Sequence, residues 1–389
     1  MSQTTGVDLT NILLVAGETS GDQHASDLIR HSQSYRPELK FIGIAGKKSQ
    51  SEGMEILADC QDLNMMGLSA VLGKAWSIVK CYRQISQQLQ QKQFACVVLV
   101  DFAGFNLRIA KLAKRFAIPV FYYIPPKVWA WKANRIKTIQ RYVDHVACIF
   151  PFEKQLYETY NINHTIVANP LIQQLQAHQQ QLARSVNKDS TSKWTIALIP
   201  GSRPNEIKHT LPQLLQAAER LDGLYNIQWL IPLGPDTAKT DIEHLVNQCP
   251  CDIKLVDSKQ RYVAYQASDI ALACSGTVTL ELALLNVPMV VFYRMSRLSY
   301  YFAKMVIQTP YVSLCNILLK SRVVEELISW RDANAENIAR QCQLLIESNT
   351  KRHQQQKHFD TIRKLLDPLQ YMRVEEAFDQ FLTNGATHD

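Results

Sequence analysis

The feature that most constrains the fold of this chain is an alternation of short apolar runs with helical stretches. The first run, NILLVAGETSGD, ends in a Gly/Ser turn, and a helical pattern follows from about 23 to 34. Further apolar runs lie at 41–46, 94–106, 118–124 and 145–152. Continuous apolar runs are typical of parallel strands covered on both faces, and their alternation with helices indicates an α/β fold.

A polar segment, QQLQAHQQQLARSVNKDSTSK, interrupts this pattern at 173–193. The alternation then restarts with WTIALIPGSR, IQWLIPLG, CDIKLVD, ASDIALACSGT and VPMVVFYR. We therefore predict an α/β fold with two Rossmann-like domains. The first spans 1–170, a linker spans 171–193, and the second spans 194–364.

Composition narrows the classes of partner. The net charge of +7 suits phosphorylated ligands or an anionic membrane surface, and no nucleic-acid motif is present. No apolar run reaches about 18 residues, and MSQTTGVDLT does not resemble a secretory signal. We therefore expect a cytoplasmic protein, free or on a membrane face. The nine cysteines form no framework, and we expect them to be reduced and mostly buried.

Several familiar motifs are missing. GLSAVLGK, beginning at Gly67, has one residue too many for a phosphate loop and no Ser or Thr after its Lys. The chain also lacks a GxGxxG after a strand, a GxSxG elbow and any Asp-x-Asp. We therefore expect neither a cofactor nor a metal.

The strongest local signal is LIPGSRPNEI, in which a strand ends in a glycine turn that opens a helix. Gly201 lets the backbone approach a ligand, Ser202 is a candidate helix cap, and Arg203 can grip phosphate oxygens. A glycine turn at a helix start is a natural anion site. The alternative is an ordinary strand–turn–helix with a surface Arg.

A second such turn lies in ACSGTVTLELALL, where Ser275, Gly276 and Thr277 separate a strand from an apolar helix. These residues can cradle a diphosphate, and Glu281, one turn into the helix, can accept hydrogen bonds from ribose hydroxyls. The alternative is a Ser/Thr-capped core helix. Two such turns in one domain favour a nucleotide site.

The first half contains two candidate acceptor segments. In AGETSGDQH, Gly17 permits a tight loop, and Glu18, Ser20 and Asp22 offer polar groups to a sugar. The alternative is a capping box of Ser20 with Gln23. Asp101 follows a buried strand, where ligands bind in parallel sheets, and can act as a general base. The alternative is that Asp101 caps the next helix.

Two segments carry apolar surface. In YYIPPKVWAWKANRIK, Trp129 and Trp131 can wall a sugar pocket, or they can form a partly buried aromatic cluster. The stretch 66–85 is amphipathic, with cations beside its apolar stripe. It is a candidate interfacial membrane helix, although its periodicity alone favours an ordinary core-facing helix.

Taken together, these segments resemble the lipid-A-disaccharide synthases, which are two-domain glycosyltransferases of the GT-B type. The matching segments are AGETSGD, MGLSAVLG, VDFAGFN, YYIPPKVWAW, FPFEKQLYE, LIPGSRPNEI, SGTVTLE, PMVVFYRM and YVSLCNIL. The resemblance implies domains that face each other across a cleft, with the helices from about 365 to 389 returning to the N-terminal domain. It also implies an inverting, UDP-dependent transfer on the cytosolic face of the inner membrane. That reaction joins UDP-2,3-diacylglucosamine to 2,3-diacylglucosamine 1-phosphate in lipid A biosynthesis.

The resemblance also implies roles for matching positions. Asp101 falls on the family's essential acid, the general base. Expected UDP-binding residues are Arg203, Ser275, Gly276, Thr277, Glu281, Asn316, Gly201, Ser202 and Arg294. Expected acceptor-binding residues are Gly17, Glu18, Ser20, Asp22, Asn106 and Trp129. Expected membrane contacts are Leu68, Val71, Leu72 and Ile78.

Five positions depart from the family pattern, namely Ala70, Gly104, Pro125, Asn169 and Ser329. They leave acyl and acceptor preference open, and a homodimer is one alternative for the oligomeric state. The rival interpretations are a divergent GT-B paralogue, such as a UDP-sugar 2-epimerase, and a non-catalytic membrane-associated UDP-sugar-binding protein.

Overall fold

The computed structural model describes most of the chain, and its residues form two compact units. The described residues are 10–60, 70–91, 93–129, 134–182, 193–234, 237, 239–297, 300, 301, 304 and 309–385. Unit 1 comprises Met1–Pro170 together with Pro368–Asp389, and unit 2 comprises Leu171–Asp367.

Unit 1 is built on a seven-stranded sheet with the order β3-β2-β1-β4-β5-β6-β7. Its strands are β1 (Asn11–Ala16), β2 (Lys40–Ala45), β3 (Glu55–Asp59), β4 (Cys96–Val100), β5 (Val120–Tyr123), β6 (His145–Cys148) and β7 (His164–Ile166). Neighbouring strands run parallel. The strand order reverses between β1 and β4, so the loops that follow these two strands lie side by side at the topological switch point.

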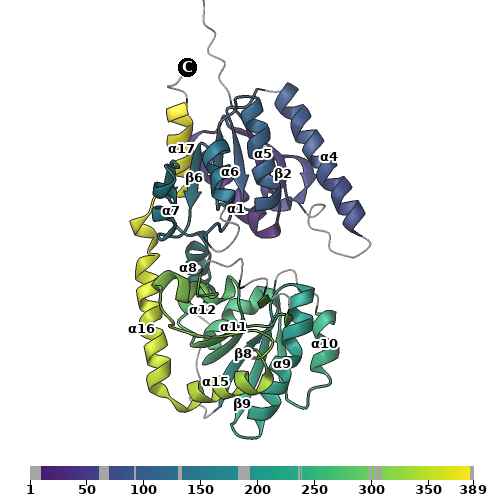
Figure 1. The fold of residues 1–389 in the computed structure, drawn as a ribbon, viewed down its shortest axis with the longest axis vertical. Helices are drawn as coiled ribbons and strands as arrows, with labels where there is room; N and C mark the ends of the chain where they lie inside the picture. Colours follow the sequence, from purple (N-terminus) through teal and green to yellow (C-terminus); the bar gives the residue numbers. More distant parts are fainter. Residues whose placement is uncertain are drawn as a thin grey trace, which may run out of the picture. The chain divides into compact units, whose positions relative to one another are not determined.

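Helices cover both faces of this sheet (Figure 1). They are α1 (Thr19–Tyr35), α2 (Lys47–Ser51), α4 (Ala70–Gln91), α5 (Ala103–Arg115), α6 (Arg135–Tyr142), α7 (Glu153–Thr159), the short η2 (Pro368–Gln370) and α17 (Val374–Gly385). The last helix, yellow in Figure 1, packs beside α1, β5 and β6. Phe378 of α17 lies edge-on to Phe121 of β5, with 5.3 Å between ring centroids. The predicted return of the C-terminal helix to the N-terminal domain is therefore confirmed.

Unit 2 repeats the same plan with a six-stranded sheet in the order β10-β9-β8-β11-β12-β13. Its strands are β8 (Trp194–Ile199), β9 (Ile227–Pro232), β10 (Ile253–Val256), β11 (Ile270–Cys274), β12 (Met289–Tyr293) and β13 (Glu325–Ile328). They also run parallel. Here the order reverses between β8 and β11, which defines a second switch point.

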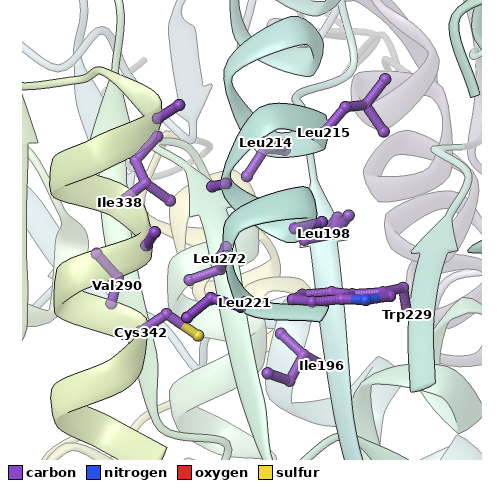
Figure 2. Close-up of a cluster of buried hydrophobic side chains, with 14 of the residues drawn as sticks. Ile196, Leu198, Leu214, Leu215, Leu221, Trp229, Leu272, Val290, Ile338 and Cys342 are labelled. Atoms are coloured by element: carbon purple, nitrogen blue, oxygen red, sulfur yellow. The ribbon is translucent and has the colours of Figure 1, made fainter. Parts of the chain in front are cut away.

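The helices of unit 2 pack with its sheet, and three of them contribute side chains to its main apolar core. They are α8 (Pro170–Leu182), α9 (Pro204–Asp222), α10 (Thr240–Val246), η1 (Ser258–Gln260), α11 (Arg261–Ala267), α12 (Val278–Leu284), α14 (Leu314–Leu319), α15 (Ala335–Glu347) and α16 (Asn349–Leu365). Figure 2 shows Leu214 and Leu221 of α9 and Ile338 of α15 gathered around the sheet residue Leu272, and all four belong to one apolar cluster. Trp229 of β9 is fully buried there, and its indole N–H donates to Asp222 at 2.7 Å.

These two sheets confirm the predicted α/β class with two Rossmann-like domains. The central strands are buried along almost their whole length because helices cover both faces, as the continuous apolar runs predict, whereas the edge strands β3, β7, β10 and β13 are mostly half-buried. All nine cysteines are free, and eight of them are buried. Among the described residues, no helix combines the length and apolar character needed to cross a membrane.

Candidate functional site

The switch point of unit 1 brings two of the predicted segments together. β1 pairs with β4 in the register Ala16 to Val100, so Gly17 and Asp101, the next residue after each strand, are neighbours. A Cβ atom on Gly17 would lie 2.1 Å from the Phe102 ring. Gly17, the first glycine of AGETSGD, is therefore required because a side chain there would collide with Phe102, the residue that follows Asp101.

Asp101 sits at a strained turn between β4 and α5. Asp101 and Phe102 both have left-handed backbones, with φ of 48° and 47°. Phe102 is the N-cap of α5, so the alternative that Asp101 caps this helix is wrong. Burial raises the pKa of the Asp101 carboxyl, while the Lys127 charge and a hydrogen bond from the Phe102 backbone act in the opposite direction. Such a shift is typical of functional carboxylates.

The remaining polar groups of AGETSGD divide into two kinds. Helix α1 begins at Thr19 with Glu18 as its N-cap, so the capping box of Ser20 with Gln23 is not formed. Ser20 is exposed and Glu18 is half-buried, both near the carboxyl end of β1.

Asp22 is instead a structural residue. It is buried, and its carboxylate accepts hydrogen bonds from the backbone N–H groups of Gly46, Lys48 and Ser49 and from the Ser49 hydroxyl. Asp22 thus caps α2 from a distance, and its oxygens are occupied within the protein. The internal bonds support a structural role for Asp22, and its contact with a sugar stays a prediction.

Asn106 is also internal. It is fully buried on α5, and its amide nitrogen donates to the Asp101 carbonyl at 2.8 Å and to the Val100 carbonyl at 3.1 Å. These bonds show that Asn106 supports the Asp101 turn, and its contact with an acceptor stays a prediction.

Trp129 belongs to an aromatic cluster. Its ring lies edge-on to Phe152, with 4.9 Å between centroids, and its indole N–H donates to Glu153 at 3.0 Å. Burial raises the pKa of Glu153 to about 7, although hydrogen bonds from Trp129 and Phe150 and the Lys127 charge favour the ionised form. The aromatic-cluster alternative therefore describes Trp129, while Trp131 lies outside the described residues.

The switch point of unit 2 brings together the two glycine turns. β8 pairs with β11 in the register Ile199 to Ala273. The turns at 200–203 and 275–277 therefore lie at the carboxyl ends of adjacent strands, where open α/β sheets bind their ligands.

The first turn is held by Glu206. Gly201 has φ of 107°, and a Cβ atom there would meet the Glu206 carboxylate at 2.8 Å. The Glu206 carboxylate accepts from the Ser202 backbone N–H at 3.3 Å and from the Arg203 guanidinium at 3.1 Å. Arg203, not Ser202, is the N-cap of α9, so the predicted cap is one residue too early. The Arg203 side chain is 65% exposed, which leaves it accessible to an anion.

The second turn presents small groups to solvent. Gly276 and Thr277 are exposed, and a Cβ atom on Gly276 would meet no other atom within 4 Å. Ser275 is half-buried, and its hydroxyl donates to the Val312 carbonyl at 3.4 Å. This open turn leaves room for a ligand against the backbone.

Glu281 lies behind this turn in a polar cluster. Burial raises its pKa, while the Arg261 charge and a hydrogen bond with Tyr262 favour the carboxylate. The Arg261 guanidinium lies 4.2 Å from the centroid of the Tyr262 ring and donates to the Tyr262 hydroxyl at 2.9 Å. The carboxylate is therefore held in place by two residues from α11.

Two predicted UDP ligands are used internally. Asn316 is fully buried, its amide nitrogen donates to the Val324 carbonyl and to Glu326, and its amide oxygen accepts from the backbone N–H groups of Val323 and Val324. These bonds show that Asn316 supports the 312–326 region, and its direct contact with UDP stays a prediction. Arg294 donates to the Ala333 carbonyl at 2.8 Å from the carboxyl end of β12.

The predicted membrane contacts fall on and before α4. Leu68 lies outside the described residues, and for Val71 and Leu72 only the helical backbone is described. Ile78 is partly buried and packs against the core of unit 1, whereas the next residue, Val79, is 45% exposed. Ile78 therefore packs on the core of unit 1 while staying partly exposed, and its contact with lipid stays a prediction.

Sequence reasoning missed the residues that position the candidate site residues or set their charge. They are Tyr122, Lys127, Glu153, Glu206, Arg261 and Tyr262. Only Glu206 carried a local signal, since it stands three residues after the N-cap, where an acid can accept from the cap backbone. The other five act through contacts or charges whose partners depend on the tertiary fold.

Comparison with known proteins identifies the family. The family described as Lipid-A-disaccharide synthetase matches residues 12–381. The chain is 37% identical to the lipid-A-disaccharide synthase of Anaeromyxobacter dehalogenans over 368 residues, covering 94% of this chain and 96% of that protein. It is also 37% identical to the synthase of Nitrosococcus oceani, covering 91% of this chain and 92% of that protein.

Solved structures share the fold at low identity. UDP-GlcNAc 2-epimerase from Neisseria meningitidis, bound to UDP-GlcNAc, aligns with a TM-score of 0.61 at 15% identity, covering 92% of this chain and 99% of that one. Arabidopsis thaliana UGT89C1, complexed with UDP, aligns with a TM-score of 0.60 at 12% identity, covering 97% of this chain and 100% of that one. The structural likeness supports the fold, while the sequence matches extend over nearly the whole chain. The chain therefore belongs to the lipid-A-disaccharide synthetase family.

Proposed function

We propose that this protein is an inverting UDP-dependent glycosyltransferase that makes the lipid A disaccharide. Its donor is UDP-2,3-diacylglucosamine and its acceptor is 2,3-diacylglucosamine 1-phosphate. The products are the β-1,6-linked disaccharide 1-phosphate and UDP. The observation that carries this proposal is the family membership over residues 12–381. The position of the candidate residues at the two switch points is consistent with it.

The reaction is a single displacement. The 6-hydroxyl oxygen of the acceptor attacks the anomeric carbon of the donor, a new C–O bond forms, and the bond from that carbon to the UDP oxygen breaks. The hydroxyl proton passes to the Asp101 carboxylate, and the electron pair of the broken bond leaves with UDP. Attack from the face opposite UDP inverts the anomeric configuration.

Asp101 is suited to the role of proton acceptor by its environment. Burial raises its pKa, which makes the carboxylate a stronger base than an exposed Asp. General bases are most effective when their pKa lies near the working pH. The Lys127 charge limits the shift and keeps the carboxylate available as a base.

Residues of unit 2 stabilise the negative charge that develops on the leaving group. Arg203 has an exposed guanidinium that can move from Glu206 to the diphosphate and form charge-assisted hydrogen bonds. Electrostatic stabilisation of a developing anion is often the largest single contribution to catalysis. The Glu281 carboxylate, held by Arg261 and Tyr262, supplies an acceptor for the ribose hydroxyls.

Both substrates are acylated, so we extend the proposal to peripheral contact with the cytosolic face of the inner membrane. The net charge of +7 is consistent with attraction to anionic lipid. On α4, the exposed side chains of Val79 and Lys80 place an apolar group beside a cation.

The test is disaccharide synthesis by the purified protein and by its Asp101→Asn variant, which is nearly isosteric but cannot accept the proton. We expect wild-type protein to form disaccharide and UDP, and the variant to lose at least about 10²-fold in kcat, as expected for a general base. UDP affinity from calorimetry should be unchanged, because UDP is held by residues of unit 2. Full activity of the variant would refute Asp101 as the base. Epimerisation of UDP-GlcNAc, with no disaccharide formed, would favour the epimerase alternative.

A further inference from the structure

The turn that carries Asp101 has an unfavourable backbone conformation. Asp101 and Phe102 are consecutive non-glycine residues with φ of 48° and 47°. Such conformations persist only where the surrounding structure imposes them, and they cluster at functional sites. The groups that impose this conformation are therefore of interest for catalysis.

Two buried side chains converge on one atom of this turn, the Asp101 carbonyl oxygen. The Tyr122 hydroxyl donates to it at 2.8 Å, and the Asn106 amide nitrogen donates to it at 2.8 Å. Both side chains are fully buried. The Asp101 backbone N–H also donates to the Tyr123 carbonyl at 3.1 Å, which ties the turn to β5.

This carbonyl needs side-chain donors because of its place in the chain. Phe102 is the N-cap of α5, and its carbonyl accepts the first helical bond, from the Asn106 backbone N–H at 3.1 Å. The Asp101 carbonyl precedes the cap, so the hydrogen-bond ladder of α5 does not use it. The Asp101 carbonyl is partly buried, so leaving it without a donor is unfavourable, and the two side chains remove that penalty only in the observed peptide orientation.

Tyr122 remains a donor over the working pH range. Burial raises its pKa well above the usual range, and the charge of Asp101 acts in the same direction. Asn106 adds a second constraint, since its amide nitrogen also lies 3.3 Å from the Val15 carbonyl and 3.1 Å from the Val100 carbonyl. It thereby joins the ends of β1 and β4 to the Asp101 turn.

We propose that Tyr122 and Asn106 are positioning residues that hold the Asp101 peptide in its left-handed conformation and thereby fix the direction of the catalytic carboxylate. This inference rests on the proposed function, in which Asp101 is the general base. Neither residue touches a substrate in this scheme. Both act through the Asp101 carbonyl, because anchoring this oxygen fixes the ψ angle of Asp101 and with it the orientation of the Cα atom that carries the carboxylate side chain.

The experiment compares Tyr122→Phe with Tyr123→Phe. Each variant loses one hydroxyl from a buried tyrosine of β5, but the two side chains lie on opposite faces of the sheet, in different core clusters. We expect Tyr122→Phe to lower kcat at least 10-fold while the acceptor KM and the UDP affinity stay within twofold. We expect Tyr123→Phe to stay within twofold of wild type in kcat.

The pH profile distinguishes positioning from simple loss of stability. Released from its fixed, buried position, Asp101 gains solvent, and its raised pKa should fall. The acid limb of kcat in Tyr122→Phe should therefore move to lower pH. If Tyr122→Phe does not fold, Asn106→Ser is measured in the same assays with the same expectations.

Three results would overturn the inference. The first is a folded Tyr122→Phe variant with wild-type kcat and an unchanged pH profile. The second is an equal loss of kcat in Tyr123→Phe. The third is a loss of kcat that only follows the drop in melting temperature.

The Asp101→Asn variant distinguishes a failure of the positioning role from a failure of the proposed function. An inactive Asp101→Asn beside a normal Tyr122→Phe overturns only the positioning, whereas an active Asp101→Asn overturns the assigned base.

Discussion

The Gly17→Ala substitution tests whether the first glycine of AGETSGD acts through Phe102. The new Cβ atom would lie 2.1 Å from the nearest atom of the Phe102 ring. Comfortable carbon–carbon contact begins at about 3.5 Å, so the ring must move by roughly 1.5 Å. Phe102 directly follows Asp101, and a misplacement of about 1 Å at a reacting group can cost about 10²-fold in rate. We therefore expect kcat to fall by about that factor.

The stability of this variant should fall much less. Overpacking of this kind costs about 1–3 kcal/mol, below the roughly 5–15 kcal/mol that separates folded from unfolded protein. The assay combines steady-state disaccharide formation with thermal melting and UDP titration. UDP affinity should be unchanged because Gly17 belongs to unit 1.

Gly21→Ala is the matched control in the same motif. A Cβ atom on Gly21 would meet its nearest neighbour, the Ala16 Cβ, at 3.6 Å, which is ordinary contact. Gly21 lies within α1, where Ala is favoured over Gly by about 0.5–1 kcal/mol, so this variant should keep its activity and be no less stable. If Gly17→Ala keeps a kcat within twofold of Gly21→Ala, the Phe102 contact does not position Asp101 and the reasoning is wrong.

Three further substitutions test the charges of the site. Lys127→Met removes a charge that lowers the Asp101 pKa, so the acid limb of kcat should move to higher pH; an unmoved limb would exclude Lys127 from the site. Burial raises the pKa of Glu153 to about 7, so the protonated carboxyl should add to the free energy of unfolding. This contribution, roughly 3 kcal/mol, should be complete below about pH 4.5 and be lost as pH rises through 7. Glu153→Gln should reduce this pH dependence in melting curves, and equal dependence in both proteins would contradict the shift. Arg203→Ala should weaken UDP binding by about 10- to 150-fold, the value of about 1.5–3 kcal/mol for a charge-assisted hydrogen bond, whereas an unchanged Kd would leave Arg203 a surface residue.

Much of the fold could be read from local residue order. The apolar runs become the buried strands because helices cover both faces of each sheet. The segments around Gly17, Asp101, Arg203 and Ser275 were placed correctly at the carboxyl ends of strands, since each follows directly after an apolar run. These are short-range properties, which the order of residues expresses directly.

Only the tertiary structure decided which strands are neighbours and where each polar side chain finds its partners. The order of residues does not show that β1 lies beside β4 or β8 beside β11, because strand order depends on the path of the crossover helices. In sequence, Asp22 and Asn316 fit the pattern of ligand-binding residues. In the structure, their side-chain oxygens accept hydrogen bonds from backbone N–H groups elsewhere in the chain. Conversely, Tyr122 reads as part of an apolar strand but donates to the carbonyl of Asp101. A buried polar atom must be hydrogen-bonded, and the identity of its partner is set by distance in space and not along the chain.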